Sequence, residues 1–339
     1  MESTNSTTVE KEEIRVNLRG RERAVSKIVP TYPISAEREC KRVARNYFKI
    51  LDRYMKEYLP PLLKAYKCDV RTDAKSDDIT AFRIRTEKSI SKMTSELEKA
   101  LKHFGMTDQL EKVSKITQTH SVKEWRKTVK AAVGIDISET YYKGGIFEQV
   151  RKAWVDSIAQ LASDLIKETV QDMSSQIITG YQTGVPYETI LEELQKTFNN
   201  SRGIIESLAA DQVSSLNSEL VERQQRDAGV KNYIWKSMGD DRVRQSHRAF
   251  DGKMFSWDAP PDGWYVTKSR GLVLTGRRCH PGQDYNCRCR ALPVFDIQSV
   301  TLPVERTVEL ERPRTAESLY PLRRRKGRVY VPASEQKMR

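Results

Sequence analysis

The sequence IFEQVRKAWVDSIAQLASDLIKETVQDMSSQII, residues 146–178, decides the fold of this chain. Charged residues such as Arg151 and Asp164 alternate in it with apolar residues that recur every three or four positions. These apolar residues are Ile146, Val150, Trp154, Ile158, Leu161, Leu165, Val170, Met173 and Ile177. A helix of this length with one apolar face buries that face against neighbouring helices. The stretch therefore predicts a helical bundle, and Gly184-Val185-Pro186 predicts where this helix ends.

The same spacing precedes this stretch. We expect a helix that begins at Ser35 and stops at Pro60-Pro61, because proline lacks an amide hydrogen and its ring clashes with the preceding turn. Cys40 falls on the apolar face of this helix, so we expect a buried thiol without reactivity. A second helix is expected over residues 78–104, with Gly105 as its stop.

Other local signals set further helix ends. Ser121 and Glu124 have the form of a capping box, in which their side chains satisfy free backbone amides at the start of a helix. They predict a short helix that begins at Ser121. Two more helices are expected over residues 187–198 and 201–228, separated by a break at Asn199-Asn200.

Composition divides the chain into four regions. We expect a flexible, polar N-terminal arm over residues 1–34, a helical region over 35–229, a small α+β module over 230–295 and an extended basic tail over 296–339. From Gly229 onward Trp, Gly, Pro, Asp and Arg become frequent and apolar runs shorten to strand length. The expected strands are residues 233–235, 253–255 and 272–274. The fold class is therefore mainly α, with a long-helix bundle before the module.

Composition also limits the cellular setting. The 339 residues are 38% hydrophobic and 31% charged, with no apolar run near the ~20 residues that a membrane span needs. The first residues do not resemble a secretory signal. The five cysteines are unevenly spaced and do not form a disulfide framework, so we expect a reducing cytosol. The formal net charge of +13 favours polyanionic partners such as nucleic acid.

Cysteine and histidine gather in the module. Cys287 and Cys289 lie in Asn-Cys-Arg-Cys-Arg, shortly after Cys279-His280, and His247 lies upstream. Thiolates and imidazoles are the usual ligands of zinc. We expect the two segments to fold together into a structural zinc site of His247, His280, Cys287 and Cys289, with Cys279 as an alternative to His280. Such an ion would stabilise a small module with few apolar side chains.

A second interpretation stays open. Cys287 and Cys289 would then be core residues beneath a strand, and the two histidines would be hydrogen-bonded to Asp240, Asp241 or Asp284. Zinc analysis of the purified protein distinguishes the two interpretations.

A further interpretation is that Asp240, Asp241, His247 and Asp251 form the centre of a metal-dependent nuclease. No hydrolase motif or phosphate-binding loop accompanies these residues. The paired aspartates also suit a helix N-cap before Val243. We therefore expect no enzymatic activity. We assign the remaining polar residues of this segment to a network that braces the module: Asp241, Arg244 and Asp251.

The basic tail contains a run of cations with two interpretations. It is a solvated segment without function, or it contacts DNA or an acidic protein surface. The residues of the predicted contact are Arg323, Arg324, Arg325, Lys326 and Arg328.

The order of residues in the module resembles the Mu F-like family of minor head proteins, which act in head morphogenesis of tailed bacteriophages. The resemblance rests on Asp-x-x-Arg-x-x-His-x-x-x-Asp-Gly followed by Asn-Cys-Arg-Cys. It covers about residues 200–295. Its residues are Trp235, Asp241, Arg244, His247, Asp251, Gly252, Phe255, His280, Pro281, Gly282, Asn286, Cys287, Arg288 and Cys289.

The resemblance implies a structural virion component that acts in procapsid and head assembly. Its expected partners are the portal protein, the major capsid or scaffold protein and double-stranded DNA, without a membrane. It would lie inside the capsid in the virion and in the host cytoplasm during assembly. The competing interpretation is a DNA-processing, metal-dependent nuclease or a nucleic-acid-binding protein.

Overall fold

The computed structural model describes residues 7–8, 20–69, 76–304, 324–325 and 328–329. They fall into two compact units, Met1–Val304 and Glu305–Arg339. The first unit contains the helices and the module. The described part of the second unit is the antiparallel pair of β9 (Arg324–Arg325) and β10 (Arg328–Val329).

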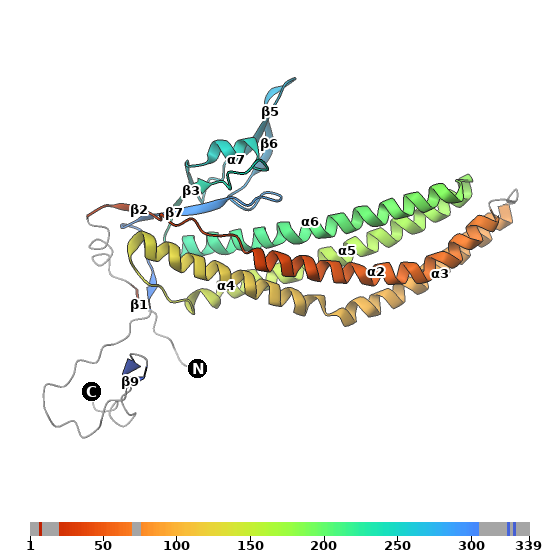
Figure 1. The fold of residues 1–339 in the computed structure, drawn as a ribbon, viewed down its shortest axis with the longest axis horizontal. Helices are drawn as coiled ribbons and strands as arrows, with labels where there is room; N and C mark the ends of the chain where they lie inside the picture. Colours follow the sequence, from red (N-terminus) through yellow and green to blue (C-terminus); the bar gives the residue numbers. More distant parts are fainter. Residues whose placement is uncertain (1–6, 9–19, 70–75, 305–323, 326–327, 330–339) are drawn as a thin grey trace. The chain divides into compact units, whose positions relative to one another are not determined.

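Long helices lying side by side make up most of the first unit (Figure 1). They are α2 (Ile34–Asp69), α3 (Ser76–Phe104), α4 (Met106–Val133), α5 (Ile146–Thr183) and α6 (Tyr187–Asp227), with the short 3₁₀ helix η1 (Tyr141–Lys143) before α5. α2 packs against α3, α4 and α6, while α5 packs against α4 and α6. Their apolar faces enclose one continuous core, in which Cys40 is buried. The bundle predicted from residues 146–178 is confirmed.

Two prolines lie inside α2, so the predicted stop at Pro60-Pro61 is wrong. Both rings lie on the exposed face, and Leu62, Leu63 and Tyr66 beyond them are buried in the core. A proline within a helix costs about 3 kcal/mol or more. Burying a large apolar side chain contributes about 1.5–3 kcal/mol. Two prolines cost about 6 kcal/mol or more, and burying the three side chains contributes about 4.5–9 kcal/mol, so the helix continues.

Two other predicted boundaries also lie within continuous helices. Ser121 lies inside α4, where its hydroxyl donates to Oε1 of Gln224 at 3.1 Å, so it does not begin a helix. Glu124 accepts a hydrogen bond from the backbone amide of Thr31 at 2.8 Å. α6 also runs unbroken through Asn199-Asn200. Partners far along the chain thus satisfy polar groups that the local sequence assigns to helix ends.

The module is built on a four-stranded antiparallel sheet in the order β2-β7-β3-β4. Helix α7 and a separate β5–β6 hairpin complete it, and Figure 1 shows the hairpin extending away from the helices. The bounds are β2 (Arg23–Val25), β3 (Asn232–Lys236), α7 (Gln245–Phe250), β4 (Met254–Ser256), β5 (Asp262–Thr267), β6 (Gly271–Arg278) and β7 (Arg290–Asp296). A further short pair joins β1 (Thr7–Thr8) to β8 (Pro303–Val304). The α+β class predicted for the module is confirmed.

The edge strand β2 comes from the segment expected to be a flexible arm. Arg23 pairs with Asp296 and Val25 with Val294 in the register of β7. Further along, the hydroxyl of Tyr32 donates to the carbonyl of Ala210 on α6 at 3.3 Å. Residues 20–34 are therefore part of the folded unit, while 1–6 and 9–19 lie outside the described residues.

The module has a small core of its own. It contains the buried residues Tyr233, Trp235, Phe250, Trp257, Cys287, Cys289 and Ala291. Phe295 at the end of β7 belongs instead to the helical core, where its ring lies 5.8 Å from that of Trp125. The two cores lie within one compact unit.

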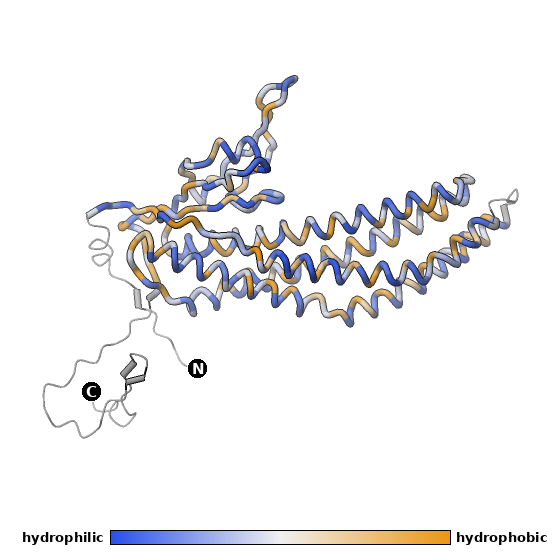
Figure 2. The backbone as a smooth tube through the Cα atoms, in the orientation of Figure 1, coloured by the Kyte–Doolittle hydropathy of each residue, from blue (hydrophilic) through white to orange (hydrophobic). Residues whose placement is uncertain are grey.

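Hydropathy varies along every helix, as Figure 2 shows. In the part of the chain that the structure describes, no helix combines the length and the apolar character needed to cross a bilayer.

Candidate metal centre

His247 meets the two thiols inside the module. Its Nδ1 lies 3.5 Å from Sγ of Cys287 and 3.8 Å from Sγ of Cys289, and all three side chains are buried. His247 comes from α7, whereas the cysteines precede β7. The predicted folding of the two segments onto each other is confirmed. We call His247, Cys287 and Cys289 the Cys–His group.

Helix α6 holds the loop that carries the thiols. Ser214 donates to the carbonyl of Cys287 at 2.5 Å, and Ser218 donates to the carbonyl of Pro281 at 2.6 Å. Asp211 accepts from the amide of Asn286 at 2.6 Å, and Gln225 donates to the carbonyl of Ala291 at 3.0 Å. We call Asp211, Ser214, Ser218 and Gln225 the α6 polar stripe. Their spacing of three, four and seven residues places them on one helix face.

Sequence reasoning did not assign a role to this stripe. The sequence does contain a pattern that marks it, because these four polar residues recur at helical spacing along α6. The prediction for this helix used only its apolar residues. Such a repeat usually marks a solvent-exposed helix face, and only the fold shows that this face packs against backbone. Buried serines and amides then satisfy loop carbonyls that would otherwise lose their hydrogen bonds.

Gly282 lets the loop approach α6 closely. Its φ of 87° lies in the left-handed region, and a Cβ there would lie 3.0 Å from Cβ of Ser218. Its amide donates to Sγ of Cys287 at 3.4 Å. The glycine thus combines a required backbone conformation with a contact that orients one sulfur.

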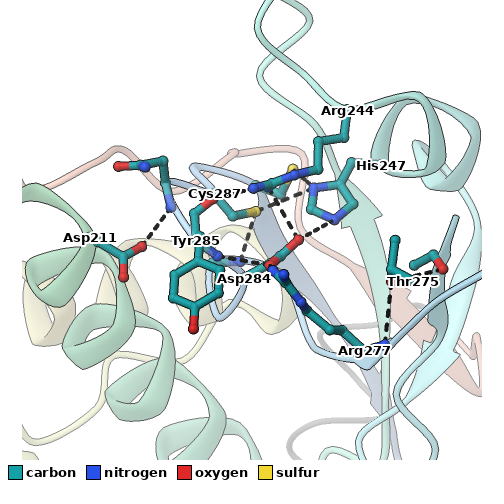
Figure 3. A network of polar contacts seen from close by, with 12 residues as sticks. Asp211, Arg244, His247, Thr275, Arg277, Asp284, Tyr285 and Cys287 are labelled. Carbon is teal, nitrogen blue, oxygen red and sulfur yellow. Dashed lines mark hydrogen bonds and ion pairs between the residues drawn. The ribbon is translucent and has the colours of Figure 1, made fainter. Parts of the chain in front are cut away.

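Asp284 lies on the other side of the imidazole (Figure 3). Its carboxylate is 3.7 Å from Nε2 of His247, 3.2 Å from Nη1 of Arg244 and 3.5 Å from Nη1 of Arg277. Arg244 also donates to the carbonyl of Tyr285 at 2.6 Å. The histidine therefore lies between a sulfur pair at one ring nitrogen and an anchored carboxylate at the other.

The two thiols differ in acidity. A hydrogen bond from Cys289 and the neighbouring His247 hold the pKa of Cys287 well below its usual range, against the opposing effect of burial. Sharing its proton with Cys287, together with burial, raises the pKa of Cys289. The lowered pKa of Cys287 favours its thiolate, which is the form of cysteine that binds metal.

His280 lies apart from the Cys–His group. Its Nδ1 is 2.9 Å from the hydroxyl of Tyr233, and its ring lies 4.7 Å from that of Trp257. Burial lowers the pKa of His280. Cys279 forms a second cluster with His247 and Asp284, whose ligand atoms lie within 4.8 Å of one another. The structure thus joins three of the four predicted ligands and places His280 in a different network.

The predicted bracing network is only partly assembled. Asp251 accepts from the amide of Ser237 at 2.7 Å and pairs with Lys236 at 3.2 Å, and Arg244 binds Asp284 as described. Asp241 is exposed and has no hydrogen bond or ion pair among the described residues. Its neighbour Asp240 pairs with Arg288 instead.

Asp240 and Asp241 do not cap a helix. α7 begins at Gln245 after Arg244, so Asp240 and Asp241 lie upstream of its first turn. Within the described ranges, no metal-binding cluster unites either residue, or Asp251, with His247. Asp240 and Asp251 neutralise arginine and lysine, which accounts for their charge.

The tail cations lie in the second unit. Arg324, Arg325 and Arg328 are on the β9–β10 pair, while Arg323 and Lys326 lie outside the described residues. Their predicted contact with DNA or a partner remains a prediction.

A cavity of about 680 Å³ borders the Cys–His group. Arg242, Arg244 and Arg288 line it together with His247, Cys287 and Cys289. A larger cavity of about 870 Å³ lies in the bundle, beside Ile90 on α3 and Val170 on α5, and its lining contains no cysteine or histidine. Of these two cavities, only the smaller is lined by residues of the Cys–His group.

Comparison with known proteins finds a family match over part of the chain. Residues 171–292 match the family described as "Phage Mu protein F like protein", which confirms the resemblance to the Mu F-like family over this segment. The chain is 26% identical over 228 residues to a Haemophilus influenzae protein described as uncharacterized. That alignment covers 65% of this chain and 46% of the relative, so the chain spans about half the length of the curated relative it matches. No solved structure matches the chain.

Proposed function

We propose that this chain, with its Mu F-like segment at residues 171–292, is a minor head protein of a tailed bacteriophage. Its role is structural, in assembly of the procapsid and head. It contacts the portal protein and the surrounding capsid or scaffold, lies inside the capsid in the virion and is in the host cytoplasm during assembly.

The proposal rests on one observation: the helix and the module of the matched segment are joined by hydrogen bonds. The matched segment begins within α5, includes all of α6 and ends in β7 at the third residue of that strand. Within it, the α6 polar stripe binds the backbone of the loop before β7 and of β7 itself. The family segment is therefore a long helix rigidly joined to a small module, which suits a bracket between larger assemblies.

The helices outside the matched segment supply the specific contacts. α2, α3 and α4 precede residue 171 and complete the bundle around α5 and α6. An assembly protein needs a surface that fits its own portal or capsid, and these helices lie outside the family segment. Double-stranded DNA is a further partner, because the net charge of +13 attracts a polyanion.

Co-purification with the portal protein of the same phage tests the proposal. The full chain is co-expressed with the tagged portal protein, and the complex is treated with nuclease before capture. We expect association that survives nuclease treatment, since the contact is between proteins, and we expect the chain in purified virions by mass spectrometry. Loss of association after nuclease treatment would show bridging by DNA alone. Absence from both the complex and the virion would refute the proposal.

A further inference from the structure

We propose that Nδ1 of His247 and the sulfurs of Cys287 and Cys289 bind one zinc ion, with the fourth position open to the adjoining cavity. His280, predicted as a ligand from the sequence, is not part of this site. The inference is independent of the proposed function, because it concerns only the chemistry of the module.

The distances in the Cys–His group fit zinc. Bonds of about 2.3 Å to sulfur and about 2.1 Å to nitrogen, at tetrahedral angles, separate the two ligand atoms by about 3.6 Å. The structure gives 3.5 Å from Nδ1 to Sγ of Cys287 and 3.8 Å to Sγ of Cys289. All three ligand atoms lie within 4.8 Å of one another. The two measured separations thus match the spacing that a shared zinc ion would give its nitrogen and sulfur ligands.

The surroundings orient the ligands as metal sites require. A histidine that binds metal through one nitrogen usually donates the other N–H to a carboxylate. Asp284 lies 3.7 Å from Nε2 of His247 and is held there by Arg244 and Arg277. Its position favours the proton on Nε2 and leaves the lone pair of Nδ1 directed at the thiols. The amide of Gly282 donates to Sγ of Cys287, as backbone amides do to ligating thiolates.

The alternative cluster of Cys279, His247 and Asp284 competes for the same histidine. Cys279 is only half-buried, and the Asp284 carboxylate is already engaged by two arginines. The Cys–His group offers two cysteine sulfurs and an imidazole in a buried site, the ligand types that zinc prefers. We therefore assign the ion to Cys287 and Cys289.

The proposed ion joins α7 to the loop before β7. This loop is already hydrogen-bonded to α6 by Ser214 and Ser218, so the ion links α7 to the helical bundle through the loop. Three protein ligands leave a fourth position, and the cavity of about 680 Å³ beside the group gives water access to it. The small core of the module gains from such a link, since few apolar side chains hold α7 in place.

Metal analysis of the full chain tests the site. After purification without chelator, we expect about one zinc per chain, and cobalt(II) exchanged into the site should give a thiolate charge-transfer band. Cys287→Ser, Cys289→Ser and His247→Gln should each lower zinc affinity at least about 100-fold. Cys279→Ser and His280→Gln are the matched controls and should retain stoichiometric zinc. Because a ligand variant can misfold, circular dichroism is recorded for each, and the cobalt(II) band of the wild type stands as an independent readout.

Two outcomes would overturn the assignment. Zinc below about 0.1 per chain, with no cobalt(II) band and no change in the urea midpoint when zinc is added, leaves the Cys–His group as a packed core. Loss of zinc in Cys279→Ser together with retention in Cys289→Ser moves the ion to the alternative cluster. Neither result bears on association with the portal protein.

Discussion

Gly229 turns the chain from α6 into the module, and its replacement by alanine tests how firmly the two are joined. Its φ is 71°, and the amide of Val230 donates to the carbonyl of Gln225 at 2.8 Å, which closes the helix end. A Cβ at this position would overlap the backbone carbonyl of Ser299, well inside the 3.0 Å that real Cβ atoms keep. The segment at Ser299 is itself fixed, because the amide of Thr301 donates to the carbonyl of Ala228 at 3.0 Å.

Two costs add in Gly229→Ala. Placing a non-glycine residue in the left-handed region costs about 1–2 kcal/mol. The overlap forces the segment at Ser299 to move, and overpacking of this kind costs about 1–3 kcal/mol more. We therefore expect the free energy of unfolding to fall by roughly 2–5 kcal/mol.

Gly184→Ala is the matched control. Gly184 has the same φ of 71° at the end of α5, and no atom lies within 4 Å of the position of its Cβ. Only the backbone cost of about 1–2 kcal/mol applies there. Urea unfolding followed by circular dichroism, with unchanged m-values, gives both free energies. Equal losses in the two variants would refute the close packing of the α6 end against Ser299.

Two further predictions concern His280 and the tail. Burial lowers the pKa of His280, so the unfolded chain binds more protons just below its own pKa of about 6.5. The contribution of neutral His280 to the free energy of unfolding is therefore complete above this pH. It is lost as the pH falls through the pKa of His280 in the folded chain. Urea unfolding from pH 7.5 to about 5.5 should show this decrease, and His280→Gln should weaken it; an identical slope in the variant contradicts the assignment. In the tail, deletion of residues 320–339 should weaken DNA binding in gel shifts and flatten its dependence on salt, by roughly 4–5 in the log–log slope if all five predicted cations contact phosphates. Binding that ignores salt, or is unchanged by the deletion, excludes the tail contact.

The sequence predicted the elements of the bundle well and some of their ends poorly. The apolar periodicity of residues 146–178 gave α5, and its predicted end at Gly184 is where the structure ends it. Pro60-Pro61 and Ser121 carried local signals for helix ends that burial and distant partners outweigh. A local signal is worth one to a few kcal/mol. Burying several large side chains on one helix face contributes more free energy than such a signal. Only the folded chain shows which faces are buried.

The sequence by itself determined that this chain forms long amphipathic helices and a small module, and that the thiols and imidazoles lie in that module. Residue types and spacing are sufficient for this, because periodicity fixes the secondary structure and ligand chemistry fixes the candidates. The tertiary structure alone decided that His247 faces Cys287 and Cys289, while His280 contacts Tyr233. The tertiary structure also decided that Ser214 and Ser218 of α6 bind the loop before β7. These choices depend on the direction of each side chain after distant segments pack together, and spacing along the chain carries no information about that direction.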